Sequence, residues 1–172
     1  MNLNLNELVQ QVNGEFAERF EGRNLDLICI LQPEPLLIRA DSRRIWRVLE
    51  NLYVNVCKYA MPGTRVYVDA IKKDGKIQLS IKNISENPLN FQADELTERF
   101  IRGDVSRSTE GSGLGLSIAK NLTVLQHGSF NIYLDGDLFK VTITFDEAVK
   151  EKKPMPPMIV PEPVQEEAQQ DV

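Results

Sequence analysis

One amphipathic helix pattern, running from Ile45 to Val56, limits the possible folds of this chain more than any other feature. Apolar residues recur there at helical spacing, so one side of the helix must be buried against another layer of structure. Asp41 is placed to cap the start of this helix, and Met61-Pro62-Gly63 is placed to end it. The apolar stripe consists of Ile45, Val48, Leu49, Leu52 and Val56.

A second stripe on the same helix is polar. Asn51, Asn55 and Lys58 follow one another at i, i+4 and i+7, roughly 100° around the helix from the apolar stripe. Asn costs about 0.5 kcal/mol relative to Ala inside a helix, so two of them one turn apart indicate a site. An Asn carbonyl oxygen suits Mg²⁺, and a Lys ammonium suits a phosphate. An ordinary solvated face would show the same stripe, and the helix alone favours that interpretation.

Length and composition exclude several classes of protein. With 172 residues, 42% of them hydrophobic, the chain is long enough for one compact domain. The net charge is −5 and no basic patch dominates, so nucleic acid is not an expected partner. Cys29 and Cys57 lie in apolar runs without CxxC spacing, and we expect reduced core thiols in a cytosolic protein. Without a run of 18 apolar residues, the chain is expected to be soluble, although it can be a piece of a larger membrane protein.

The first forty residues predict a helix followed by two extended segments. Asn4 can cap the helix, with Glu7 three residues later as in a capping box, and Gly22 can end it. The apolar run 25–31 predicts a buried strand, and 36–39 predicts a short extended segment after two prolines.

Two alternating segments predict β-hairpins. The first covers 65–84 and turns at Asp74-Gly75, and the second covers 129–145 and turns at Asp135-Gly136. With the helices, these elements predict an α+β fold, a two-layer sandwich in which about three helices cover one face of a mixed sheet of about five strands.

Two more helices and a tail complete the prediction. A short helix is expected at 94–100, and a longer one runs from Leu114 to a stop at Gly128. The Pro- and Glu-rich segment 151–172 cannot bury much surface and is expected to be disordered, which leaves 1–150 as one domain. The longer helix is expected to bury a face made of Leu114, Ile118, Leu122 and Leu125.

A glycine cluster, Gly111-x-Gly113-x-Gly115, opens the longer helix. Glycines let the backbone approach a phosphate closely, and a helix N-terminus supplies unpaired N–H donors. The cluster lacks the Lys-Ser/Thr of a Walker A loop, and no strand leads directly into it as in a dinucleotide fingerprint. It can therefore also be a flexible loop, just as Arg102 and Arg107 before it can reach a terminal phosphate or be ordinary surface charges.

Taken together, these motifs resemble the catalytic ATP-binding domain of bacterial two-component sensor histidine kinases, in the GHKL ATPase superfamily. Residues 51–59 resemble that family's N box, 98–102 its F box, and 111–116 its G2 box, and the resemblance covers roughly 3–145. It implies a Bergerat-type α/β sandwich that binds ATP and Mg²⁺.

The resemblance also implies residue roles. Asn55 would hold Mg²⁺, Asn51 would lie beside it on the phosphates, and Arg102 would steady the γ-phosphate; these three are the expected catalytic residues. Lys58 and Tyr59 would contact phosphate and ribose or adenine. Residues 102–113 would form a lid that orders on nucleotide. The other residues expected at the nucleotide are Phe100, Arg107, Gly111, Ser112, Gly113, Leu114, Gly115 and Leu116.

One box departs from the family pattern. The family has Asp-x-Gly-x-Gly where this chain has Asn83-Ile-Ser85-Glu-Asn87, and the family's Asp accepts a hydrogen bond from the adenine amine. Asn83 keeps an acceptor oxygen but loses the charge, which makes such a bond roughly half as strong. We therefore expect ATP to bind, more weakly than in the family. The alternative is that Asn83 bonds its own turn.

Two residues bear on the choice among related functions. Members that hydrolyse ATP or phosphorylate serine carry a Glu where this chain has Asn51, and Glu50 lies about 100° away around the helix, so fast hydrolysis is not expected. The single histidine, His127, matches a structural position. The phospho-accepting histidine is therefore expected on a dimerisation domain absent from this chain.

The expected function is that of a histidine kinase catalytic domain, acting on that histidine with a cognate response regulator downstream. The resemblance further implies a monomer in the cytoplasm whose parent protein is anchored in the bacterial membrane. The alternatives are a nucleotide-binding pseudokinase or scaffold module, and a serine kinase or ATPase of the same superfamily.

Overall fold

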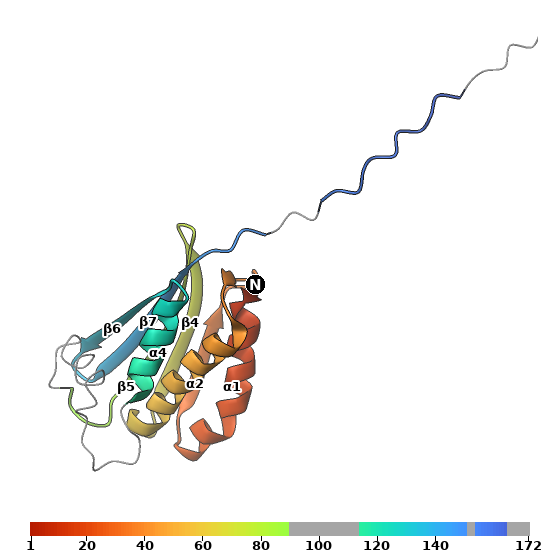
Figure 1. Ribbon diagram of the computed structural model, residues 1–172. Helices are drawn as coiled ribbons and strands as arrows, with labels where there is room; N and C mark the ends of the chain where they lie inside the picture. Colours follow the sequence, from red (N-terminus) through yellow and green to blue (C-terminus); the bar gives the residue numbers. More distant parts are fainter. Residues whose placement is uncertain (90–113, 151–153, 165–172) are drawn as a thin grey trace, which may run out of the picture.

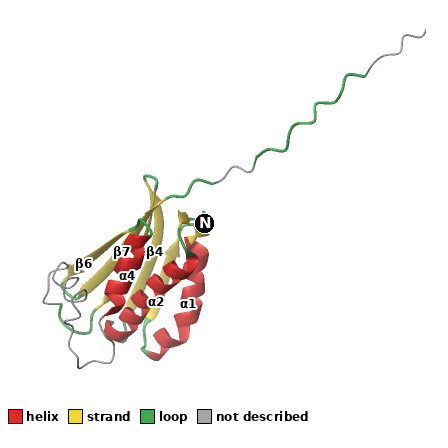
Figure 2. Cartoon of the chain, in the orientation of Figure 1, coloured by secondary structure: helices red, strands yellow, loops and turns green. Residues whose placement is uncertain are grey.

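The computed structural model describes residues 1–89, 114–150 and 154–164, and these residues form two layers (Figure 1). Three helices of the described part lie on one face of a five-stranded sheet (Figure 2). The helices are α1 (Leu5–Gly22), α2 (Ser42–Tyr59) and α4 (Leu114–Leu125). The strands of the sheet, in spatial order, are β2 (Asp26–Leu31), β4 (Arg65–Lys73), β5 (Lys76–Ile84), β7 (Leu138–Asp146) and β6 (Ser129–Asp135).

The sheet is mixed because β2 runs parallel to β4, while the other neighbouring strands are antiparallel. The connection from β2 to β4 passes through α2, which is how parallel neighbours are usually joined. The predicted α+β two-layer sandwich is therefore confirmed.

A small second sheet joins the two ends of this unit. Its strands are β1 (Asn2–Asn4) and β3 (Leu37–Arg39), which pair antiparallel. The Ala148 N–H donates to the Leu37 carbonyl oxygen at 2.8 Å, and the Asn2 side chain donates to the Val149 carbonyl oxygen at 3.4 Å. The first residues of the chain and the residues after β7 therefore lie at the same corner (Figure 1).

The N-terminal caps of α1 and α2 are the residues that the sequence predicts. Asp41 Oδ1 accepts the N–H groups of Arg43 and Arg44 at 2.8 and 3.3 Å, and all five residues of the apolar stripe of α2 are buried. Asn4 accepts the Asn6 N–H at 3.2 Å, so α1 begins as predicted. Glu7, however, accepts from the Asn4 side-chain amide at 3.0 Å, whereas a capping box would use the Asn4 backbone N–H.

Strand β2 corrects one prediction. Segment 25–31 was predicted as a buried strand, but β2 lies at an edge of the described sheet, and the side chain of Ile30 is 59% exposed. Cys29 on β2 is exposed and Cys57 on α2 is partly exposed, so neither is the core thiol that the sequence suggested. The apolar run reflects pairing with β4 and packing under α1, and it does not bury both faces of the strand.

Helix α4 corrects another prediction. Leu114 and Leu125 are exposed, and the buried residues are Leu116, Ser117, Ala119 and Thr123. The helix packs beside α2 and over β6, and small residues on its buried side let the elements approach closely. The predicted face is thus only partly on the core side, because Ile118 is half-buried and Leu122 packs against the core.

Both predicted hairpins are present. Asp74 and Gly75 both have positive φ, as a two-residue type I′ turn requires, while the second turn falls at Gly136-Asp137, one residue later than predicted. After α4, the left-handed residue is His127, with φ of 64°. Gly128 serves packing, because a Cβ added there would lie 2.6 Å from Phe145 Cε1.

Some predictions fall outside the described residues. These are the helix at 94–100, the lid at 102–113 and the tail residues 151–153 and 165–172; residues 154–164 are exposed and form neither helix nor strand. Among the helices of the described part, none is both long and apolar enough to cross a membrane.

Candidate functional site

The polar stripe of α2 lies against the first turn of α4. A Cβ added to Gly115 would lie 3.4 Å from Oδ1 of Asn51, so the backbone of α4 passes directly over this side chain. The Asn51 amide nitrogen donates to the Arg47 carbonyl oxygen at 2.7 Å, which holds the side chain along the helix. The first turn of a helix carries unpaired N–H donors and a partial positive charge. Two motifs more than 60 residues apart in the sequence therefore form one polar surface.

Asn55 and Lys58 extend this surface along α2. Asn55 is half-buried and lies one turn beyond Asn51, and Lys58 is exposed near the end of the helix. The surface thus offers neutral amide groups beside a helix N-terminus, with one ammonium at its edge. This combination suits an anion bound together with a hard cation.

The end of α2 is hydrogen-bonded to the end of β5. The Met61 N–H donates to the Ile84 carbonyl oxygen at 2.8 Å, and the Glu86 N–H donates to the Tyr59 carbonyl oxygen at 2.8 Å. Between these bonds, Ala60 forms an antiparallel bridge with Ser85. The chain following Asn83 is therefore fixed beside the last turn of α2.

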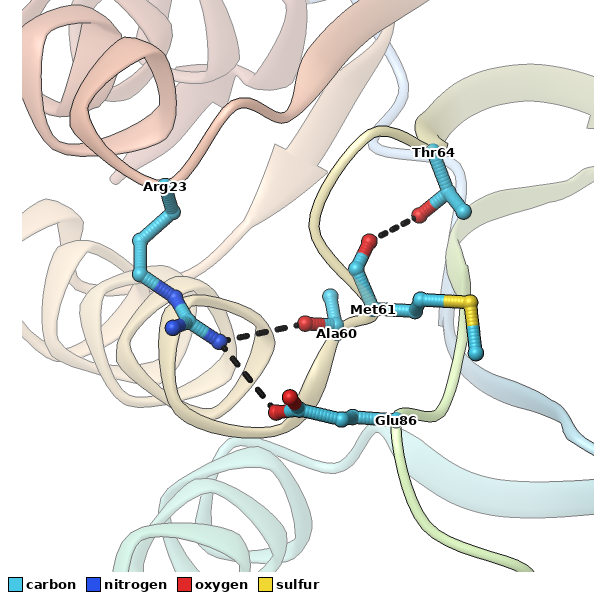
Figure 3. Close-up of polar contacts among 5 residues, drawn as sticks. All are labelled: Arg23, Ala60, Met61, Thr64 and Glu86. Atoms are coloured by element: carbon cyan, nitrogen blue, oxygen red, sulfur yellow. Dashed lines mark hydrogen bonds and ion pairs between the residues drawn. The ribbon is translucent and has the colours of Figure 1, made fainter.

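Arg23, at the end of α1, contacts both segments of this junction (Figure 3). Its Nη2 donates to the Ala60 carbonyl oxygen at 3.2 Å and lies 3.6 Å from Oε2 of Glu86. On the other side of the loop, the Thr64 hydroxyl donates to the Met61 carbonyl oxygen at 2.5 Å. Arg23 contacts both segments because it is the C-terminal cap of α1, whose end reaches this junction.

Asn83 is the polar member of an otherwise apolar row on β5. The row faces the helix layer and consists of Ile77, Leu79, Ile81 and Asn83, all buried. Asn83 is 3% exposed, and in the described part of the chain its Oδ1 has no hydrogen-bond partner. A buried carbonyl left unpaired costs about 1–3 kcal/mol. In the described part of the chain, this oxygen therefore accepts no hydrogen bond from its own turn.

The remaining predicted residues divide into two groups. Tyr59 is half-buried at the end of α2, Leu114 is exposed at the start of α4, and Leu116 is a buried core residue, so its side chain faces the core. The other predicted residues lie outside the described part of the chain, and their roles stay predictions: Phe100, Arg102, Arg107, Gly111, Ser112 and Gly113.

Sequence reasoning missed Arg23. No motif marks it among the 20 Lys and Arg residues, and nothing in its neighbourhood in the sequence points to residues 60 and 86. A signal would have required knowing where α1 ends relative to the end of β5, which is set by tertiary packing.

Comparisons with known proteins agree with this geometry. A family model described as the histidine kinase-, DNA gyrase B-, and HSP90-like ATPase matches residues 40–149. The chain is 31% identical over 123 residues to the signal transduction histidine-protein kinase BaeS of Escherichia coli (strain K12), covering 70% of this chain and 26% of that protein. It is 29% identical over 130 residues to the sensor histidine kinase RppB of Synechocystis sp., covering 74% and 29%. The chain thus spans about a quarter of the length of these curated relatives.

Solved structures show the same fold. The catalytic domain of histidine kinase ThkA, in a nucleotide-free form, superposes with a TM-score of 0.74 at 25% identity, covering 86% of this chain and 95% of that one. The mycobacterial sensor histidine kinase MprB superposes with a TM-score of 0.70 at 22% identity, covering 86% and 97%.

Proposed function

Because the chain belongs to the histidine kinase-, DNA gyrase B- and HSP90-like ATPase family, we propose that it is the Mg²⁺-ATP-binding catalytic domain of a sensor histidine kinase. Its reaction is transfer of the γ-phosphate of ATP to a histidine on a dimerisation domain. The observation that carries the proposal is the unpaired, buried carbonyl oxygen of Asn83, on a strand whose end is hydrogen-bonded to the end of α2. An orphaned acceptor fits the exocyclic amine of adenine, and the helix N-terminus fits the phosphates.

The residues present also fit a magnesium ion. The side-chain oxygen of Asn55 would hold Mg²⁺, and Asn51 would contact the phosphates beside it. When bound, the ion neutralises charge on the triphosphate, which is the main requirement of phosphoryl transfer. Lys58, the N–H groups at the start of α4, and Arg102 and Arg107 complete the proposed phosphate contacts.

Asn51 favours phosphate transfer over hydrolysis. A neutral amide cannot accept a proton from water, so the position offers no general base. This argues against a serine kinase or ATPase of the same fold. The proposed acceptor is a histidine of the parent kinase, and the proposed downstream partner is a response regulator. The ThkA histidine kinase, whose fold this chain shares, has been solved in complex with response regulator protein TrrA. We place the domain in the cytoplasm, where ATP is available.

Calorimetric titration with a non-hydrolysable ATP analogue, with and without Mg²⁺, tests this proposal. The native chain should bind in the micromolar range and more tightly with Mg²⁺. Asn55→Ala should abolish the gain from Mg²⁺ without lowering the free energy of unfolding, because Ala is the better helix former. Asn121→Ala, at an exposed position of α4, is the matched control and should behave as the native chain.

Two results would contradict the proposal. If the native chain shows no binding up to millimolar nucleotide, the domain is a scaffold and the altered 83–87 box is the first segment to repair. If Asn55→Ala keeps the full gain from Mg²⁺, the metal is held by other residues.

A further inference from the structure

In the described part of the chain, the side-chain oxygen of Asn83 remains available to recognise a base. The neighbouring N–H donors are already used: Ser85 donates to the Asp137 carbonyl oxygen at 2.7 Å, and Glu86 donates to the Tyr59 carbonyl oxygen at 2.8 Å. On the adjacent strand β7, Phe139 pairs with Asn83 and is buried, so it adds an apolar wall with no polar side-chain group.

An amide in this place differs from a carboxylate in one chemical respect. A carboxylate only accepts hydrogen bonds, so it can bind an amino group and repels a carbonyl oxygen. An amide carries one acceptor and one donor side by side, and a rotation of about 180° around the last side-chain torsion exchanges them. The Oδ1 of Asn83 accepts no hydrogen bond in the described structure, so no such bond fixes one of the two orientations.

Purine bases present the matching pairs of groups. A 6-aminopurine offers a donor at position 6 next to an acceptor at N1, and a 6-oxopurine offers an acceptor at position 6 next to a donor at N1. In one orientation the Asn83 amide complements the first edge, and in the other it complements the second.

We propose that Asn83 makes this site accept both 6-amino- and 6-oxopurine nucleoside triphosphates. The proposal rests on the proposed function, since it concerns the base bound at the same site. Its basis is the juxtaposition of a buried amide, whose Oδ1 has no partner, with backbone donors that are already engaged.

The test compares three nucleotides on the unmodified chain by calorimetric titration in Mg²⁺. They are ATP, inosine triphosphate, and purine riboside triphosphate, which carries only hydrogen at position 6. We expect dissociation constants for ATP and inosine triphosphate within about tenfold of one another. Purine riboside triphosphate should bind about tenfold more weakly than both, because one hydrogen bond to the amide is lost.

Asn83→Asp should make the affinities for the 6-amino- and the 6-oxopurine nucleotide differ. ATP should still bind, while the affinity for inosine triphosphate should fall by about a hundredfold or more, because the carboxylate faces the oxygen at position 6. Asn83→Ala should weaken both nucleotides to a similar extent. Thermal unfolding of each variant checks its fold, and the three-nucleotide comparison on the native chain decides the question if a variant fails to fold.

The possible failures are distinguishable. If ATP binds and inosine triphosphate binds more than a hundredfold more weakly to the native chain, the inference is wrong and the proposed function stands. If neither binds up to millimolar concentration, both are wrong. If Asn83→Asp weakens the two nucleotides equally, Asn83 does not contact position 6 and the inference is overturned.

Discussion

Gly115 provides a test in which stability and binding should change in opposite directions. It lies in the first turn of α4 with no positive φ, and Ala is up to about 1 kcal/mol more favourable than Gly in a helix. The added methyl carbon would lie 3.4 Å from Asn51 Oδ1, an ordinary van der Waals distance, so the fold has room for it. Gly115→Ala should therefore raise the free energy of unfolding by up to about 1 kcal/mol, or about 3 °C in Tm.

The same methyl group would stand between the first turn of α4 and the polar stripe of α2. If a phosphate approaches the backbone there, Gly115→Ala should raise the dissociation constant for Mg²⁺-ATP at least tenfold. Urea unfolding gives the stability and calorimetric titration gives the affinity. Gly14→Ala is the matched control, because Gly14 lies inside α1 with no atom within 4 Å of an added Cβ. It should gain similar stability without any change in affinity.

A native affinity in Gly115→Ala would refute the role of this glycine in phosphate approach. A loss of stability greater than about 1 kcal/mol would show instead that crowding against Asn51 outweighs the gain in helix propensity.

Three further changes test the packing around the site. Gly128→Ala should lower the free energy of unfolding by about 1–3 kcal/mol without changing nucleotide affinity, because the added carbon would lie 2.6 Å from Phe145 Cε1; urea unfolding measures it. Burial raises the pKa of Tyr53 above its usual value of about 10, so its contribution to stability is complete below about pH 10 and is lost as the pH rises further. Tyr53→Phe should make unfolding free energy less dependent on pH between about 9 and 11, and an unchanged slope would contradict this. Arg23→Ala removes an ion pair to Glu86 whose side chains are 37% and 49% exposed, worth about 0.2–1 kcal/mol, and a hydrogen bond to the Ala60 carbonyl oxygen, worth about 0.5–1.5 kcal/mol, so the loss of stability should be about 1–2 kcal/mol. It should nevertheless weaken nucleotide binding several-fold, because the 85–87 segment loses its tie to α1, and calorimetry that finds native affinity would exclude this role.

The parts of the fold that were predictable are those specified locally. Asp41 caps α2 through its own neighbours, and Asp74-Gly75 forms its turn because both residues tolerate positive φ. The burial of β2 was not predictable, because an apolar run does not reveal whether a strand lies at an edge. The buried side of α4 depends on how closely α2 and β6 approach it, and small residues such as Ala119 decide this in a way that leucine spacing does not show.

The candidate site likewise contains residues that the sequence predicts and residues that only the structure reveals. The contact of Gly115 with Asn51 agrees with the predicted joining of the two motifs, and Asn83 was found because it departs from a family pattern. That its oxygen is buried without a partner required the structure. Arg23 could not be found at all, since its contacts with Ala60 and Glu86 depend on the relative placement of three elements.

The corner at which Asn2 and Val149 meet lies beside the start of α2. The Ala40 N–H donates to the Met1 carbonyl oxygen at 3.2 Å, and α2 starts two residues later, so this helix extends away from the corner. Asn55 lies roughly 20 Å from the corner along α2, at about 1.5 Å per residue. A rotation of the whole domain by about 10° around the corner would therefore carry the proposed metal-binding position through roughly 3.5 Å, further than one hydrogen bond is long. A small change in the orientation of the domain about this corner would thus be enough to move the proposed site relative to groups outside the domain.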